Sequence, residues 1–204
     1  MSPEFLIVAL IVVLIPGTGV VYTITTGLVC GRRESIAAAF GCTLGILPAI
    51  FAAVAGLAAV LHASALVYEV VKFCGVGYLL FLAWQTIKES GPLQISANAP
   101  RVSDYYSIAR TGCLINVLNP KLSVFFLAFL PQFVDADGAA AVAQMLLLGA
   151  VFMAMTFVVF VVYGIFAALI GERIFRSERV LTWMRRSVAL VFVGFGLRLA
   201  LTGR

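Results

Sequence analysis

Two short groups of residues in this sequence could do chemistry, because each interrupts an apolar run that otherwise suits a helix. They are Pro16-Gly17-Thr18-Gly19 and Asn119-Pro120-Lys121. Proline lacks an N–H and clashes with the carbonyl one turn back, so each group should leave backbone N–H and C=O groups without helical partners. Freed N–H groups favour a carboxylate, and freed carbonyls accept hydrogen bonds from an ammonium. Together the two groups are a candidate site for a zwitterion such as an amino acid.

Lys121 strengthens the second group as a candidate site, since a lysine deep in a membrane costs roughly 2.5–3.5 kcal/mol on insertion scales. It follows directly on the break, beside the Asn119 amide, which can donate and accept hydrogen bonds. The alternative is that Lys121 extends its side chain to the inner interface. We favour a binding role, because its expected depth is about 13 Å at 1.5 Å per residue.

Composition sets the class of protein that must position these residues. Of 204 residues, 63% are hydrophobic and only 11% are charged, whereas a soluble domain is about 25% charged. This excludes a cytosolic enzyme, a nucleic-acid-binding protein and a disordered chain. No alternating strand pattern suggests a β-barrel. We expect an all-α integral membrane protein with a single transporter domain over residues 1–204, with no enzymatic activity, no cofactor and no metal site.

Charged residues divide the chain into six expected transmembrane helices. These cover about 5–31, 36–60, 65–87, 111–134, a segment within 140–170, and 187–203. A polar linker over 90–110 separates two half-repeats, 1–89 and 111–204. Among the connections and the N-terminal end, lysine and arginine occur only in the odd-numbered connections, so these should be cytoplasmic and both termini should face outward. The basic residues of those connections are Arg32, Arg33, Lys88, Arg101, Arg110, Arg173, Arg176, Arg179, Arg185 and Arg186.

The positions of the two breaks predict an inverted repeat. Spans one and four each open one half of the chain, and they should cross the membrane in opposite directions. This gives three spans followed by three spans of inverted topology. Matching Gly/Pro interruptions in two such halves indicate a transporter's midplane site. The alternative is two unrelated proline kinks, and Pro48 in span two is a kink without an obvious counterpart.

Glu69, near the outer end of span three, is the candidate for carrying a coupling proton. The alternative is a structural ion pair with Lys72, three residues further on the same helix face. Embedded carboxylates are otherwise scarce, which favours a neutral substrate, such as a homoserine-, threonine- or leucine-like molecule, over a basic amino acid or a cation.

Asn119-Pro120-Lys121 and the residues that follow it, Leu-Ser-Val-Phe-Phe-Leu-Ala-Phe-Leu-Pro-Gln-Phe-Val at 122–134, resemble the signature of the LysE/RhtB family of amino-acid exporters. Pro16-Gly17, Gly31-Arg32-Arg33, Gly77-Tyr78-Leu79-Leu80 with Trp84, and Gly194-Phe195-Gly196-Leu197-Arg198-Leu199 also fit. The resemblance implies a multi-pass exporter of amino acids or their derivatives in a bacterial inner membrane, driven by the proton gradient and forming a homodimer. The family usually has Pro-Gly-Pro in span one. Here Thr18 replaces the second proline, which adds a hydroxyl, and Gly19 follows it.

Two features leave alternatives open. Cys30 and Cys113 would lie at the inner ends of spans one and four, so a membrane thiol–disulfide carrier is an alternative function, although neither cysteine neighbours a helix break. Gly41 and Gly45 form a GxxxG motif, with Ala37 one turn before. Small residues allow helices to approach closely. The motif therefore predicts either packing inside the protein or a dimer interface.

Overall fold

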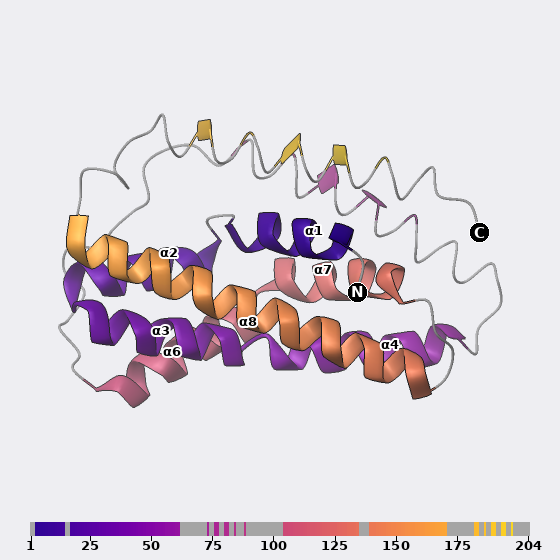
Figure 1. Ribbon diagram of the computed structural model, residues 1–204, viewed down its shortest axis with the longest axis horizontal. Coiled ribbons are helices and arrows are strands. Elements are labelled where there is room, and N and C mark those ends of the chain that lie inside the picture. Colours follow the sequence, from indigo (N-terminus) through magenta and orange to yellow (C-terminus); the bar gives the residue numbers. More distant parts are fainter. Residues whose placement is uncertain are drawn as a thin grey trace.

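The computed structural model describes residues 3–14, 17–61, 104–134 and 139–170, with isolated positions within 73–88 and 182–197. Every regular element in these residues is helical, and the described segments lie side by side along one long axis (Figure 1). They correspond to the expected spans one, two, four and five. Most of expected spans three and six, including Glu69, lies outside the described residues.

The first span is broken at its midpoint. Helix α1 (Pro3–Leu14) and helix α2 (Thr18–Val29) have 12 residues each. The two helices are bent by 54° relative to each other. The interruption predicted from Pro16-Gly17 is therefore present. Gly31 connects α2 to the next helix with a φ of 114°, a left-handed conformation that favours glycine.

The second span also contains a discontinuity. Helix α3 (Arg32–Leu44) and helix α4 (Leu47–Leu61) are separated by a turn at Gly45 and Ile46. Pro48 explains this turn, because it has no N–H to donate to the carbonyl of Leu44 one turn earlier. The stretch Arg32–Gly56 is long and apolar enough to cross a membrane.

The fourth expected span begins earlier than predicted and breaks where predicted. Helix α6 (Tyr105–Val117) has 13 residues, and helix α7 (Pro120–Phe129) continues into the 3₁₀ turn η1 (Leu130–Phe133). The expected linker over 90–110 thus contains the first residues of α6. The physical reason is the N-cap Asp104, whose carboxylate accepts hydrogen bonds from the N–H groups of Tyr106 and Ser107 at 3.1 and 3.2 Å.

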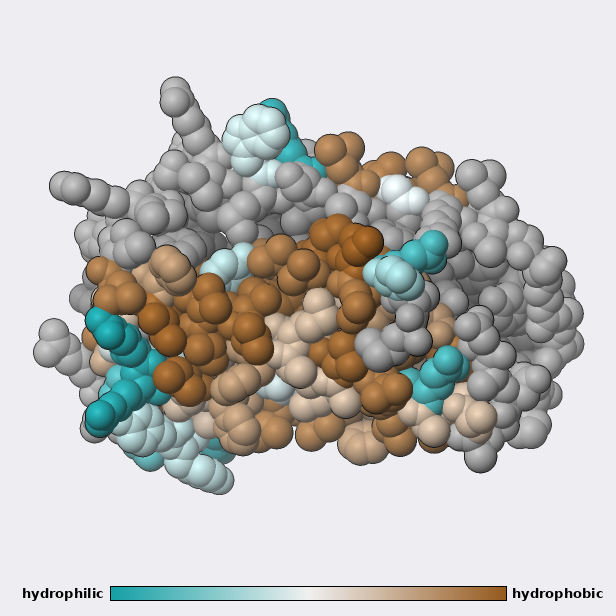
Figure 2. Space-filling model, in the orientation of Figure 1, coloured by the Kyte–Doolittle hydropathy of each residue, from teal (hydrophilic) through white to brown (hydrophobic). Residues whose placement is uncertain are grey.

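Helix α8 (Ala139–Ile170) is continuous over 32 residues, a length of about 48 Å at 1.5 Å per residue. It crosses the other helices in front of them in Figure 1. Large apolar side chains remain exposed along its length, as expected of a helix that contacts lipid. These include Leu146, Leu147, Val158, Val162, Phe166 and Leu169. The described part of the face in Figure 2 is mainly apolar, with hydrophilic side chains toward its ends and upper edge.

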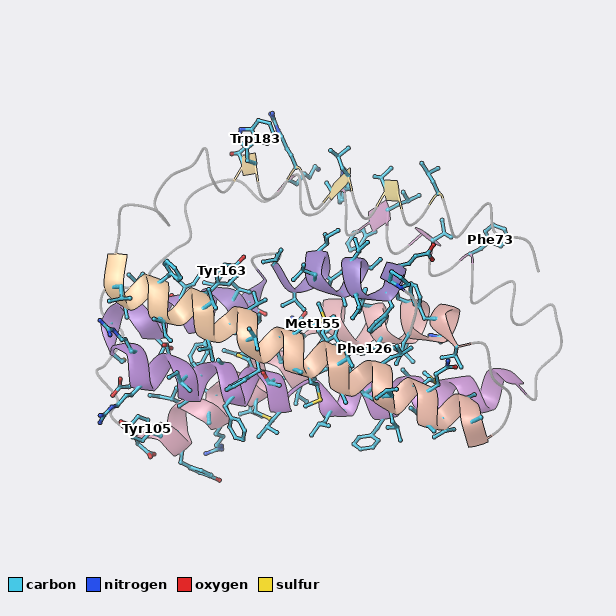
Figure 3. The ribbon with its side chains drawn as sticks, in the orientation of Figure 1. Phe73, Tyr105, Phe126, Met155, Tyr163 and Trp183 are labelled. Carbon is cyan, nitrogen blue, oxygen red and sulfur yellow. The ribbon has the colours of Figure 1, made fainter. Side chains whose placement is uncertain are left out.

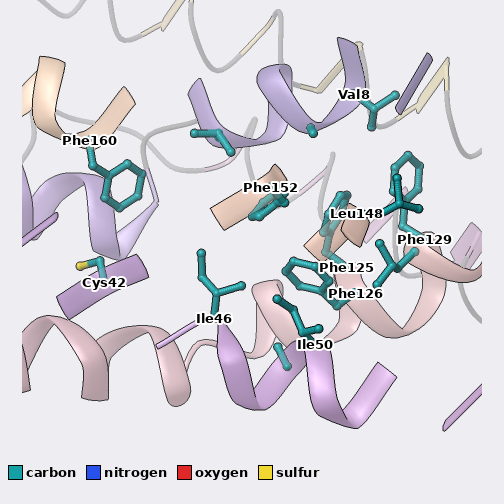
Figure 4. Packing of buried hydrophobic residues seen from close by; sticks show 14 of the residues in the cluster. Val8, Cys42, Ile46, Ile50, Phe125, Phe126, Phe129, Leu148, Phe152 and Phe160 are labelled. Carbon is teal, nitrogen blue, oxygen red and sulfur yellow. The ribbon is translucent and has the colours of Figure 1, made fainter. Parts of the chain in front are cut away.

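The bundle is packed by different residues at its two ends. The end that contains α1, α4, α7, η1 and the start of α8 has a cluster of aromatic rings, and we call it the phenylalanine half (Figure 4). Its rings belong to Phe5, Phe125, Phe126, Phe129, Phe133 and Phe152. The end that contains α2, α3, α6 and the last turns of α8 is packed through glycines, and we call it the glycine half. Its glycines in closest contact are Gly27, Gly41, Gly45, Gly112 and Gly164.

The GxxxG motif packs inside the protein. A β-carbon on Gly41 would overlap the backbone of Ala109, and one on Gly45 would overlap the carbonyl of Cys113. Both contacts join α3 to α6. Gly112 of α6 reciprocates, because a β-carbon there would lie 2.9 Å from the carbonyl oxygen of Ala38. Of the two alternatives that the sequence left open, this face of α3 is an internal helix contact.

Candidate functional site

The two helix breaks meet. The Asn119 side-chain amide donates a hydrogen bond to the Thr18 hydroxyl, with 3.3 Å between Nδ2 and Oγ1. These residues are 101 positions apart in the sequence, and each lies beside its own break. A proline at position 18 could not make this contact. Thr18 therefore links the start of α2 directly to the turn between α6 and α7.

A cavity of about 60 Å³ lies where the breaks meet, between the glycine half and the phenylalanine half. A single water needs roughly 10–15 Å³ of such volume, so the cavity has room for several waters or a small solute. Its polar lining residues are Gly17, Gly19, Asn116, Asn119 and Thr156. Its apolar lining residues are Val12, Val13, Val20, Ile46, Leu122, Phe125, Phe152 and Phe160. The cavity thus offers both hydrogen-bonding groups and hydrocarbon contacts to a bound molecule.

The first turn of α2 faces this cavity without a side-chain cap. Gly17 is the N-cap residue in an extended conformation, and no side chain accepts a hydrogen bond from the turn that follows it. The Gly17 carbonyl accepts from the N–H of Val21 at 2.9 Å, which begins the helix. The N–H groups of the first turn have no partner within the helix. Since Gly17 and Gly19 line the cavity, this end of α2 offers donors and partial positive charge to a bound anion.

The end of α1 is held by a tyrosine from α8. The hydroxyl of Tyr163 donates to the carbonyl of Leu14 at 3.0 Å, and Figure 3 shows Tyr163 on the α8 segment nearest the break. Leu14 is the last residue of α1, so its carbonyl has no helical partner. The tyrosine supplies that partner in a region where water is scarce.

Helix α7 starts at the second break. Pro120 is its first residue, a position where proline is favoured because its missing N–H would have no partner anyway. The N–H groups of Leu122 and Ser123 donate to the Asn119 carbonyl at 3.2 and 3.3 Å. Asn119 therefore ends one helix segment, begins the next, and uses its side chain to reach Thr18.

Asn116 is a site residue that sequence reasoning missed. It lies one turn before Asn119 on α6 and is only 4% exposed. Its Nδ2 donates to the carbonyl of Cys42 on α3 at 2.7 Å, and the residue lines the cavity. A signal was available in the sequence: residues three apart share a helix face, so Asn116 and Asn119 form a polar stripe on an apolar segment.

Thr156 is the second missed residue. It lies near the middle of α8, is 3% exposed, and donates its hydroxyl to the Phe152 carbonyl at 2.8 Å. A threonine that bonds to its own helix is common in membranes and gives no sequence signal of a site. Only the packing of α8 against the two breaks brings Thr156 to the cavity.

Of the residues predicted to form the site, three meet at the cavity: Gly17 and Asn119 line it, and Thr18 bonds to Asn119. The backbones of Pro120 and Lys121 form the start of α7, but their side chains are outside the described part of the chain. Pro16 and Glu69 lie outside the described residues. Cys30, Cys42 and Cys113 are free thiols.

Oppositely directed broken helices around a mainly apolar cavity with a few polar lining residues are typical of a helical membrane protein of the transporter class. The sequence places the chain within that class. Residues 10–203 match the family described as LysE type translocator, and the chain belongs to this family. It is a multi-pass membrane protein.

Similar proteins cover nearly the whole chain. An "Uncharacterized membrane protein" of Vibrio cholerae serotype O1 is 33% identical over 96% of this chain and 94% of its own length. A "Leucine efflux protein" of Enterobacter sp. strain 638 is 26% identical over 96% of this chain and 93% of its own. A "Leucine efflux protein" of Klebsiella pneumoniae is 27% identical over 96% of this chain and 92% of its own length. No solved structure matches the chain.

Proposed function

We propose that this protein exports neutral amino acids with apolar side chains, leucine among them, across the bacterial inner membrane. The observation that carries the proposal is the cavity at the meeting point of the two breaks, which is lined by both polar and apolar residues. The names of two relatives, each a leucine efflux protein, support the same class of cargo.

The helix ends around the cavity suit a zwitterion. Helices α2 and α7 begin there, so their positive ends can bind a carboxylate. Helices α1 and α6 end there, so their negative ends can bind an ammonium. Discontinuous helices with this arrangement bind charged groups of a solute in secondary transporters. Pro16, Gly17, Thr18, Asn119, Pro120 and Lys121 are the residues to which we assign binding and translocation.

The apolar lining residues of the cavity select the side chain of the cargo. Phe125, Phe152 and Phe160 face the same space as Ile46 and Leu122. Among the described lining residues there is no aspartate or glutamate, so a second ammonium on the cargo would have no carboxylate partner. Burying such a charge without a partner is costly. The cavity therefore favours a leucine-like cargo over lysine or arginine.

The direction of the described spans supports the proposed topology. In Figure 1, α1 and α2 run from right to left, while α6 and α7 run from left to right. This agrees with six helices in a 3+3 inverted repeat with both termini outside. We further propose proton antiport, with Glu69 as the proton carrier, and a homodimer.

Efflux from proteoliposomes tests the cargo. The purified protein is reconstituted, and vesicles are loaded with radiolabelled leucine, threonine, homoserine or lysine, with and without an imposed pH gradient. We expect leucine efflux to be fastest and to accelerate with the gradient. Lysine efflux faster than that of every neutral amino acid would reject the proposed specificity. A metabolite profile of medium and cytosol from an overexpressing strain would then identify the exported compound.

Substitution at the breaks tests the site. We expect Lys121→Ala and Pro16→Ala each to abolish efflux while membrane insertion is unchanged, because both positions flank the breaks where the cargo should bind. Lys88→Ala is the matched control, because Lys88 lies over the Trp84 ring at 4.0 Å, away from the two breaks in the sequence. Normal export by both break variants would show that the cargo binds elsewhere.

A further inference from the structure

The orientation of the Asn116 amide follows from its hydrogen bond. Its nitrogen lies 2.7 Å from the Cys42 carbonyl oxygen. A carbonyl can only accept, so the nitrogen must be the end that faces Cys42. The other end of the amide, Oδ1, is consequently a fixed acceptor.

This acceptor opens onto the cavity. Asn116 is 4% exposed and belongs to the cavity wall. Among the described residues, none donates a hydrogen bond to Oδ1. The same part of the chain contains no fully enclosed side-chain oxygen or nitrogen without a partner. Oδ1 therefore reaches the free space, where a donor from a bound solute can satisfy it.

Gly19 keeps the acceptor accessible. A β-carbon on Gly19 would lie 2.8 Å from Oδ1 and 3.1 Å from a ring carbon of Phe160. Gly19 also belongs to the uncapped first turn of α2, which offers N–H donors to the same cavity. The Oδ1 acceptor and the N–H donors of the first turn of α2 thus lie beside the same glycine and line the same cavity.

We propose that Asn116 is the residue that recognises the amino group of the cargo. Its Oδ1 accepts a hydrogen bond from the ammonium, while the first turn of α2 binds the carboxylate. This inference rests on the proposed function and deepens it. The cavity selects amino acids over 2-oxo and 2-hydroxy acids that carry the same side chain, because those acids supply no donor or only one to Oδ1.

Competition in proteoliposomes containing the full chain measures this selectivity. Exchange of radiolabelled L-leucine is inhibited with unlabelled L-leucine, 2-hydroxy-4-methylpentanoate or 4-methyl-2-oxopentanoate. A site that bonds to a polar group rejects analogues that lack it strongly, so we expect the oxo acid to compete about 10- to 100-fold less well than leucine. The hydroxy acid should fall between them.

Two variants separate recognition from support of the fold. Asn116→Leu removes the acceptor and also the bond to Cys42. Gly19→Ala places a methyl group 2.8 Å from the acceptor, so the amide must shift, but the nitrogen that bonds to Cys42 is kept. In both variants, we expect leucine and the oxo acid to inhibit exchange at concentrations within about threefold of each other. The main reason is that leucine should bind more weakly. Gly77→Ala is the control, because a β-carbon there has nothing within 4 Å, and it should keep the wild-type ranking.

Ligand-induced protection from thermal unfolding in detergent gives a second readout for variants that transport poorly. Binding to the folded state stabilises it by RT ln(1 + L/Kd), where L is the ligand concentration, so the unfolding midpoint rises with ligand concentration once that concentration exceeds Kd. Leucine should protect the wild type at concentrations where it no longer protects Gly19→Ala. If both variants keep the wild-type preference for leucine over the oxo acid, Asn116 has only a structural role and the inference is wrong. If the wild type exchanges no amino acid at all, the proposed function itself fails, which is a separate result.

Discussion

Helices pack against each other in opposite ways in the glycine half and the phenylalanine half of the bundle. In the glycine half, helix backbones touch directly: a β-carbon on Gly27 would overlap the carbonyl of Gly164, and one on Gly41 would overlap Ala109. In the phenylalanine half, rings separate the helices, with the centroids of Phe126 on α7 and Phe152 on α8 4.9 Å apart. The candidate site lies between these two kinds of contact.

This difference indicates which half of the bundle can rearrange. Backbones in contact have no side chain that can change its rotamer to relieve a displacement, so the glycine half should behave as one rigid unit. Aromatic rings can slide and tilt against each other at a small cost, because offset and edge-on arrangements are close in energy. The ring pair of Phe126 and Phe152, 4.9 Å apart and edge-on, is an example. We expect rearrangements around the cavity to fall on the phenylalanine half.

The largest effect should come from adding one carbon to the glycine half. Gly41→Ala places a methyl group inside the Ala109 backbone, which forces α3 and α6 apart. We expect a destabilisation of about 3 kcal/mol or more, at the upper end of overpacking costs. The measurement is the thermal unfolding midpoint in detergent, with Gly194→Ala as the control, because nothing lies within 4 Å of a β-carbon there. Equal midpoints would show that this seam is not rigid.

Changing a ring in the phenylalanine half should cost less. Phe126 is fully buried against Phe125 and Phe152, yet leucine can fill much of the same volume. We expect Phe126→Leu to destabilise by about 1–2 kcal/mol in the same assay. The comparison between halves would be reversed if this variant unfolded at a lower temperature than Gly41→Ala.

A smaller effect should follow at the link between the halves. Tyr163 lies beside Gly164 in the glycine half and donates to the last carbonyl of α1 at Leu14. Tyr163→Phe removes only that hydrogen bond, so we expect a loss of about 1 kcal/mol. Tyr22→Phe is a matched comparison, because the Tyr22 hydroxyl bonds to the Ile108 carbonyl at 2.9 Å within the glycine half. No change in either variant would mean that these hydroxyls contribute nothing to the joining of the helices.

The smallest effect should come from the cysteines. Cys30→Ala combined with Cys113→Ala should leave efflux within about twofold of wild type, the range typical of substitutions outside a site. A thiol–disulfide carrier would lose all activity in this variant. Complete loss of activity would therefore favour the redox alternative over an exporter.

Local rules predicted the breaks correctly. Pro16-Gly17 and Asn119-Pro120 interrupt helices because proline and glycine act through their own backbone, and both interruptions are present. Helix α6 begins earlier than predicted from the sequence, and the available signal was Asp104, a residue type favoured at helix N-caps. The earlier start of α6 puts the second break near the middle of its span. The first break also lies near the middle of its span.

Tertiary packing determined what the sequence could not reveal. The GxxxG motif does not indicate which helix packs against it. Only the folded chain shows that Gly112 of α6 makes the reciprocal contact. Asn116 and Thr156 come to the cavity because α6 and α8 pack around the breaks. The binding and translocation roles of Pro16, Gly17, Thr18, Asn119, Pro120 and Lys121, and the proton-carrying role of Glu69, remain predictions.

The position of each break at the middle of its span has a further consequence. A helix that is already divided can pivot at the division without unwinding a turn on either side. The chain therefore has two joints, at Gly17 and at Asn119, which lie beside the same cavity. Swinging α1 or α7 about its joint would open a path to one surface while the glycine half stays still.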